Sequence, residues 1–251
     1  QQMWSAASDL AQHSTVQPYL TQIEQVMSID GSGIDNGLDA FFAALNAASV
    51  DPTSNPLRQQ VITSAQALAQ QFNSLGQVLL NQLSSVMQQR RAITEQVSSL
   101  AADIAALNQQ IMDARAKGIN ASGLIDTRDH KIDELASLVA LQVVEQADGS
   151  RSVSLRDGQP LVIGSTAATM SVQTQPDGTQ LLGVRFARET FTLTGEGLGG
   201  QLGGLYDLEN EVLRPMMQAR TELAEHLATR VNDVLAAGYT PAGAPGQPLF
   251  E

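Results

Sequence analysis

The chain has 251 residues, with 14 Lys and Arg against 26 Asp and Glu, a net charge of −12 and no cysteine. The length allows one large or two small domains. The acidic balance argues against nucleic acid as a partner, because phosphate binding needs a basic surface. Absence of cysteine removes disulfides, thiol catalysis and Cys-ligated zinc. No apolar run approaches the roughly 18–20 residues of a membrane span, so we expect no membrane partner.

The N-terminal part of the chain is predicted to be helical. Apolar residues at helical spacing predict a helix from Met3 to Met27, with a weak point near Pro18. A glycine-rich break at 29–33 separates it from an alanine-rich helix over 34–48. The run 51–56, with two prolines, is typical of a loop.

A helix that restarts near Leu57 carries the strongest periodicity. Steps of four and three continue through five heptads, broken only by Arg90, at Leu79, Leu83, Val86, Arg90, Ile93, Val97, Leu100, Ile104, Leu107, Ile111 and Ala114. This pattern predicts a coiled-coil seam or a long bundle helix, a rod of roughly 60 Å. Its outer face is predicted to carry glutamines that pack on neighbours without desolvating charges, such as Gln82, Gln89 and Gln96.

Gly118 suits the C-terminus of the long helix, and a shorter helix follows over 124–141. After this shorter helix, the apolar residues recur with a period of two. Alternating residues and Asp-Gly turns predict antiparallel strands at 142–145, 152–155, 160–164, 169–174, 181–186 and 189–194. A helix then returns from Leu205 to Ala237, where Pro215 kinks or restarts it and Gly238 ends it.

These elements predict an α+β, mainly α fold. We expect an elongated antiparallel helical bundle with long coiled-coil-like helices and an inserted small antiparallel β domain. The predicted domains are a first bundle part at 1–141, the β insert at 142–200, and a returning helix with a C-terminal loop at 201–251.

The run Gly195–Gly200 matches G-x-G-x-x-G, the glycine pattern of dinucleotide sites. Such a site also needs a parallel strand after the following helix, and the strands here are predicted to be antiparallel. We therefore interpret the run as a glycine-rich junction that returns the chain to the bundle. No cofactor is expected.

Three groups of polar residues resemble metal sites only loosely. Asp126, His130 and Glu134 share one helix face, which we interpret as salt-bridged or solvated because Arg128 and Lys131 accompany them. The second group lies on one helix and is interpreted as structural: Glu222, His226 and Arg230. The third group matches a calcium-binding loop only poorly: Asp30, Ser32 and Asp35.

Catalysis has no support in the sequence. The three histidines, His13, His130 and His226, lie outside any nucleophile-elbow context. We predict no catalytic, cofactor-binding or metal-binding residues. We therefore expect that the protein is not an enzyme.

Several segments in order resemble the flagellar hook-associated protein 1 family, the bacterial hook–filament junction protein. Leu124–Leu135 is similar to the family's LLDQRDQLLDEL signature, departing from it at Ile125, Thr127, His130 and Lys131. The other matching segments are 51–61, 143–150, 158–162, 199–205, 231–239 and 249–250.

The resemblance implies a structural subunit of the flagellum. It implies a ring of copies of this chain, with hook protein and flagellar hook-associated protein 3 as axial neighbours. It also implies an extracellular place, reached through the flagellar export apparatus without a cleaved signal peptide. The chain is expected to be a core fragment lacking both terminal segments, including the C-terminal segment that binds an export chaperone. The alternatives are a secreted coiled-coil adhesin or antigen, and a dinucleotide-binding protein using Gly195–Gly200.

Overall fold

The computed structural model describes residues 2–28, 33–240 and 243–251. The chain folds as two compact units, each built from two separate stretches. Unit 1 comprises the residues up to 18 together with 84–210, and unit 2 comprises 19–83 together with 211–251.

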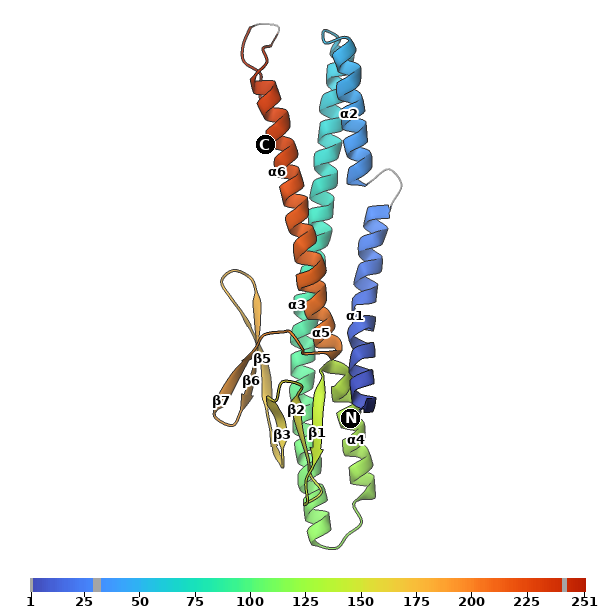
Figure 1. Ribbon diagram of the computed structural model, residues 1–251, viewed down its shortest axis with the longest axis vertical. Coiled ribbons are helices and arrows are strands. Elements are labelled where there is room, and N and C mark those ends of the chain that lie inside the picture. Colours follow the sequence, from blue (N-terminus) through green and yellow to red (C-terminus); the bar gives the residue numbers. More distant parts are fainter. Residues whose placement is uncertain (1, 29–32, 241–242) are drawn as a thin grey trace. The chain divides into compact units, whose positions relative to one another are not determined.

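Most of the described residues are helical (Figure 1). The helices are α1 (Gln2–Ser28), α2 (Ile34–Val50), α3 (Asn55–Ala116), α4 (Ser122–Leu138), α5 (Gly200–Asp207), the π-helix η1 (Leu208–Leu213) and α6 (Arg214–Ala236). The strands are β1 (Leu141–Glu145), β2 (Arg151–Leu155), β3 (Pro160–Ile163), β4 (Thr166–Ala167), β5 (Thr169–Thr174), β6 (Gln180–Phe186) and β7 (Glu189–Leu193). The predicted class, mainly α with long helices and antiparallel strands, is confirmed.

All strands belong to unit 1 and form two antiparallel sheets, ordered β1-β2-β3-β4 and β5-β6-β7. The β1–β2 turn contains Gly149 with a φ of 88°, a conformation that glycine adopts without strain. The β5–β6 turn uses Gly178 in the same way, with a φ of 81°. Both predicted hairpins are therefore confirmed, whereas the two-residue strand β4 was not predicted.

The heptad pattern of α3 is confirmed, but its buried face in unit 1 is wider than a two-position seam. Val86, Ile93, Val97, Leu100, Ile104 and Ile111 are buried as expected. A third column, Thr94, Ala101 and Asn108, spaced by seven residues, is buried as well. A helix that packs on a β-sheet as well as on helices needs this broader contact face.

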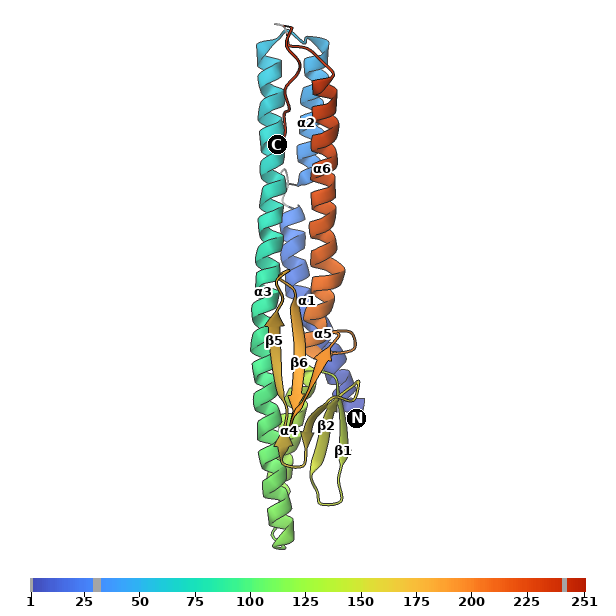
Figure 2. The ribbon, with the colours of Figure 1, turned by 90° about the vertical axis from the view of Figure 1, so that its left-hand side faces the viewer.

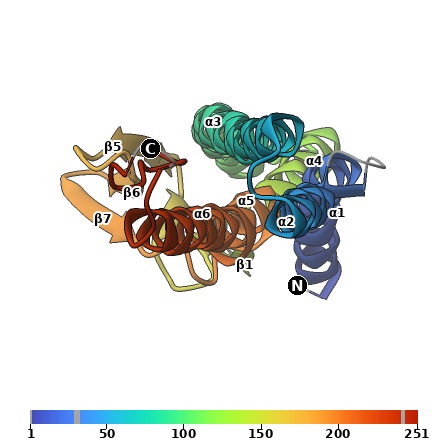
Figure 3. The same ribbon diagram turned by 90° about the horizontal axis from the view of Figure 1, so that it is seen from above.

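The core of unit 2 gathers α2, α3 and α6 around Phe41, Ala65, Leu68 and Phe72 (Figure 3). The last residues of the chain complete it, because the Phe250 ring meets the Phe41 ring edge-on at 5.7 Å between centroids. The segment that carries Phe250 returns alongside α6 (Figure 2).

Asn232 of α6 fixes this returning segment. Its Oδ1 accepts the backbone N–H groups of Leu249 at 2.8 Å and Phe250 at 3.1 Å, and its Nδ2 donates to the Phe250 carbonyl at 2.7 Å. One amide side chain thus satisfies three backbone groups of an otherwise irregular segment.

Replacing Asn232 by alanine is expected to lower the free energy of unfolding of unit 2 by about 1–3 kcal/mol, because backbone groups lose their partners. Asn232→Asp keeps the acceptor but loses the donor, so an intermediate loss is expected. Urea unfolding and hydrogen exchange at the Leu249 and Phe250 amides measure both effects. Gln218→Ala, on the exposed side of α6, is the control and should stay within about 0.5 kcal/mol. If Asn232→Ala and Gln218→Ala were equally stable, the role of Asn232 in fixing the returning segment would be wrong.

The returning helix departs from the prediction at η1. In an α-helix, Leu208 and Val212 share a face, and the sequence predicts both to be buried. The structure buries Leu208 and Leu213, whereas Val212 is only half-buried. In a π-helix, residue i+5 bonds to residue i, so Leu213 comes to lie on the same side of the helix as Leu208. Pro215 is the second residue of α6, and the backbone of Leu213 before it is already α-helical, so the chain passes from η1 into α6 without a break.

Three other expectations about exposure and bending need correction. Gln82, predicted to face outward, is only 4% exposed, and Gln89 is half-buried, whereas Gln96 is exposed. Gln82 is three residues after buried Leu79 and four before buried Val86, which places it on the buried side. Leu10 of α1 is exposed although its spacing predicts burial. α1 also continues through Pro18.

Candidate functional site

The predicted salt-bridged face of α4 is confirmed. His130 Nδ1 lies 3.0 Å from one Glu134 carboxylate oxygen, and Lys131 Nζ lies 3.1 Å from the other. Asp126 is exposed and lies one turn before them. Arg128, expected on the same solvated face, is instead buried. Within the described residues, no group of three or more His, Cys, Asp or Glu side chains is gathered as metal ligands would be.

The other polar groups singled out in the sequence are on the surface or outside the described residues. Glu222 accepts a hydrogen bond from Gln218 Nε2 at 2.8 Å, and His226 and Arg230 are exposed. His13 is exposed on α1. The prediction about Asp30 and Ser32 lies outside the described residues.

The glycine run serves close packing in unit 1. Gly195, Gly197, Gly199 and Gly200 all have positive φ. A Cβ on Gly199 would lie 2.6 Å from the Ala140 Cβ, and one on Gly200 would lie 2.6 Å from the Leu138 carbonyl oxygen. The Ala140 N–H donates to the Leu198 carbonyl at 2.6 Å. The chain therefore returns to helix by passing directly over the end of α4.

This geometry replaces the dinucleotide interpretation of the run. In that interpretation the glycines would admit a pyrophosphate at a helix N-terminus within parallel βαβ topology. Here the close approach at Gly199 and Gly200 is to Leu138 and Ala140 of the same chain. The strand pairs before the run are antiparallel. The alternative function based on the run is therefore wrong.

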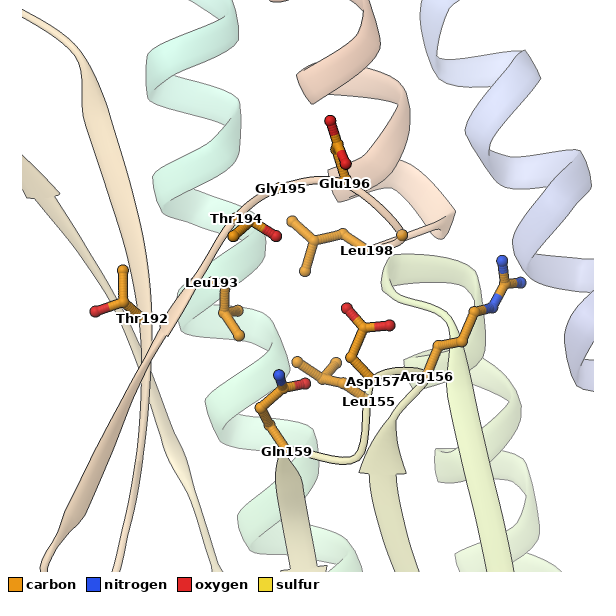
Figure 4. Close-up of a pocket in the computed structure, with 11 residues that line it drawn as sticks. Leu155, Arg156, Asp157, Gln159, Thr192, Leu193, Thr194, Gly195, Glu196 and Leu198 are labelled. Carbon is orange, nitrogen blue, oxygen red and sulfur yellow. The ribbon is translucent and has the colours of Figure 1, made fainter.

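A small open cavity of about 70 Å³ lies beside the run, between the β2–β3 turn and the segment after β7 (Figure 4). Figure 4 shows Asp157 and Gln159 directed toward the segment that carries Leu198, with the Arg156 guanidinium directed away. The lining holds carboxylates, an amide and threonines, but no histidine, lysine or cysteine.

Arg128, in the signature segment of α4, is the largest fully buried side chain among the described residues, at 1% exposed. Its Nη1 donates to the Gly149 carbonyl at 2.7 Å, and its Nε and Nη2 each donate to Asp129 Oδ1 at 3.1 Å. Burial lowers the pKa of Arg128, and the hydrogen bond from its guanidinium to Asp129 opposes this effect. Arg128 thus fastens the β1–β2 turn to α4.

The same turn is shaped by Asp148. Its Oδ1 accepts the Ser150 hydroxyl at 2.7 Å and the Ser150 N–H at 2.8 Å, and these bonds lower the pKa of Asp148. Because the folded pKa is below the unfolded one, this stabilisation is complete above the unfolded pKa. It is lost as the pH falls through the folded pKa.

Asp129 joins Arg128 to a second arginine. Arg151 Nη1 donates to Asp129 Oδ1 at 2.6 Å, and the Arg151 guanidinium carbon lies 5.8 Å from the centre of the Trp4 ring. Trp4 Nε1 in turn donates to Asp133 Oδ1 at 2.5 Å. The network connects α1, α4 and the β1–β2 hairpin.

α3 carries polar anchors for both sheets. Asn108 Nδ2 donates to the Arg151 carbonyl at 2.9 Å and the Gly164 carbonyl at 2.8 Å, while its Oδ1 accepts the Arg151 N–H at 3.0 Å. Ser98 Oγ accepts the Met170 N–H of β5 at 2.8 Å. Asn108 was not predicted as an anchor, although its place immediately after Leu107 of the heptad was an available signal.

Arg90, the residue that breaks the heptads, is buried against Glu209 of η1. Arg90 Nη2 forms an ion pair with Glu209 Oε2, and both side chains are buried. Arg90 Nη1 also donates to Gln180 Oε1 of β6 at 3.1 Å. Arg90 and Asn108 are 18 residues apart, five turns, so both anchors lie on one side of α3.

Arg128 and its partners Asp129 and Gly149, together with Gly199 and Gly200, lie in segments that resemble a known family. The family described as flagellar hook-associated protein FlgK helical domain matches residues 20–250. The chain belongs to this family. The match covers more than half of the chain and includes the α4 signature, the glycine run and Asn232.

Known relatives agree with this assignment. The chain is 27% identical over 237 residues to flagellar hook-associated protein 1 of Escherichia coli (strain K12), covering 92% of this chain and 43% of that protein. It is 25% identical over 258 residues to flagellar hook-associated protein 1 of Bacillus subtilis (strain 168), covering 92% and 51%. The chain thus spans about half the length of the curated relatives it matches.

A solved structure shares the fold. The flagellar hook junction protein FlgK from Burkholderia pseudomallei superposes with a TM-score of 0.90 at 28% identity, covering 99% of this chain and 46% of that one. Within the described residues of this family member, no helix combines the length and apolarity needed to span a membrane.

Proposed function

We propose that this chain is part of a structural subunit of the bacterial flagellum, forming the junction between hook and filament. The match to the FlgK helical-domain family over residues 20–250 carries the proposal. Likeness to the solved hook junction protein supports it over 99% of the chain. A general coiled-coil adhesin or antigen would share the heptads without this match.

The arrangement of buried polar groups fits a structural role. Arg90, Asn108 and Arg128 each join helix to strand or turn. Their polar atoms are used for holding the unit together, whereas catalytic groups need unpaired atoms that face a substrate. That the subunit is not an enzyme is part of the proposal, and the match to the FlgK helical-domain family supports it.

The partners follow from this role. We propose a ring of copies of the chain, with hook protein and flagellar hook-associated protein 3 as axial neighbours, in a whole protein exported to the cell exterior without a cleaved signal peptide. An export chaperone would bind a C-terminal segment of that protein. We also propose residues 142–200 as a domain inserted between helical parts 1–141 and 201–251. The strands between Leu141 and Leu193, and the return to helix at Gly200, support this division.

Deleting the gene in a motile strain tests the proposed function. The deletion strain should be non-motile, with hooks that lack filaments in electron micrographs and with flagellin monomer in the medium. The wild-type gene supplied in trans should restore filaments. Filaments of normal number and length on the deletion strain would refute the junction role.

A further inference from the structure

In unit 2, α3 carries no charged residue after Arg58. The sequence from Gln59 to Gln89 contains no Asp, Glu, Lys or Arg, in a chain whose charged residues make up 16%. Six exposed amides form a stripe on this helix, which we name the amide face: Gln59, Gln66, Gln70, Asn73, Gln77 and Asn81. At 100° per residue, all six lie within a sector of about 80°.

Two exposed aliphatic side chains border the amide face. Ile62 is 40% exposed and Leu80 is 50% exposed. They are 18 residues apart, five helical turns, so they lie on the same side of α3. The stripe therefore combines uncharged hydrogen-bonding groups with apolar area along one edge.

α6 in the same unit shows how the solvated surface is otherwise built. Its exposed positions include Glu222, Glu225, Arg230 and Asp233. Exposed charges are also present on α2, at Asp35 and Asp39. The amide face is thus a local departure from the charged surface of its own unit.

We propose that the amide face of α3 is a contact surface between copies of this chain. Every copy carries a net charge of −12, so two copies repel each other wherever their acidic surfaces approach. A face without charges lets a like-charged copy approach without desolvating ions. Each amide both donates and accepts hydrogen bonds, so the face bonds the mixed polar surface of a neighbour in more than one register.

A second copy is the occupant that these charges favour. A partner of another sequence need not be acidic and would be bound more strongly through opposite charges. A contact between identical acidic chains, by contrast, gains from a long stretch of helix without charges. The inference rests on the proposed function, which supplies the assembly in which copies meet.

Site-specific photocrosslinking tests the inference in the whole protein. Gln70→p-benzoylphenylalanine places a photoreactive group in the middle of the amide face, and Glu225→p-benzoylphenylalanine on exposed α6 is the matched control. Tagged and untagged copies are expressed together in a strain lacking the chromosomal gene, and isolated hooks with filaments are irradiated. We expect a tagged–untagged dimer from the residue-70 variant, at least fivefold more abundant than from the residue-225 variant, with the joined peptides identified by mass spectrometry.

The outcomes separate the inference from the proposed function. If filaments are present and residue 70 is joined to a different flagellar protein, the inference that a second copy of this chain contacts the amide face is overturned. Filaments present without any product at residue 70, or with equal dimer from both positions, would overturn the amide face as a contact surface. Normal filaments in the uncomplemented deletion strain would remove the proposed function, and the inference with it.

Two negative charges added to the amide face give an independent readout. Gln70→Glu with Gln77→Glu should reduce the number of filamented hooks about tenfold, because the added charges meet an acidic copy. The melting temperature of the purified chain should be unchanged, because both positions are exposed. Glu222→Gln with Glu225→Gln is the control and should leave filament number unchanged. Full filament number in the Gln70→Glu, Gln77→Glu strain would also overturn the inference.

Discussion

Replacing Arg128 by alanine is expected to lower the free energy of unfolding of unit 1 by about 3–5 kcal/mol. The guanidinium is buried and makes three hydrogen bonds, one to the Gly149 carbonyl and two to Asp129. Its removal leaves the Gly149 carbonyl without this donor and opens a cavity between α4 and the β1–β2 turn. Urea unfolding measures the change in free energy. Hydrogen exchange at residues 146–150 shows whether the turn has been released.

Two further variants separate charge from geometry. Arg128→Lys keeps the charge, but a single ammonium cannot reproduce the planar fork that reaches both Gly149 and Asp129, so most of the loss should remain. Arg156→Ala is the control. Arg156 is about half exposed and lies 3.8 Å from Asp9, a surface pair expected to contribute less than about 1 kcal/mol. If Arg128→Ala proved no more destabilising than Arg156→Ala, the anchoring role of Arg128 would be wrong.

The long helix α3 shows how much of the fold local sequence predicts. Its heptads continue through five repeats, and their apolar members are mostly buried. The hairpins were predicted for a similar reason, because Asp-Gly turns between alternating strands are local signals. Elements of this kind are fixed by residues close together in the chain.

Burial of a polar side chain is not fixed in this way. Arg128 and Lys131 are three residues apart on one short helix, and both were assigned to a solvated face. Arg128 is buried because its partner is a carbonyl 21 residues later, at a turn whose position depends on the whole unit. Gln82 is a different case, because its spacing of three residues from Leu79 and four from Val86 already places it on the buried side of α3.

η1 was missed because a π-helix has no periodic signal of its own. A single widened turn shifts the helix phase, so Leu213 rather than Val212 becomes buried. Leu205 before that turn is buried, and so is Leu208, the first residue of η1. The same turn carries Glu209, whose burial has no local signal in the sequence, because its partner Arg90 lies 119 residues earlier in the chain.

The pair formed by Arg90 and Glu209 gives the second large prediction. Arg90→Met alone removes the ion pair from the buried Glu209 carboxylate, and Glu209→Met alone removes it from the buried Arg90 guanidinium. Each single change should lower the free energy of unfolding of unit 1 by about 3–5 kcal/mol. Removing both charges at once, in Arg90→Met with Glu209→Met, should restore most of that loss, because buried apolar residues of similar volume need no partner.

A double-mutant cycle from urea unfolding measures this coupling, with Arg91→Met as the control on the exposed side of α3. Gln180 sharpens the cycle, since Arg90 Nη1 also donates to its Oε1. Gln180→Ala in the double variant should have a smaller effect than in the parent chain, because the donor has already been removed. Additive losses in the cycle would mean that Arg90 and Glu209 act independently. A large coupling would identify the heptad-breaking arginine as a residue that holds Glu209 of the π-helix to α3.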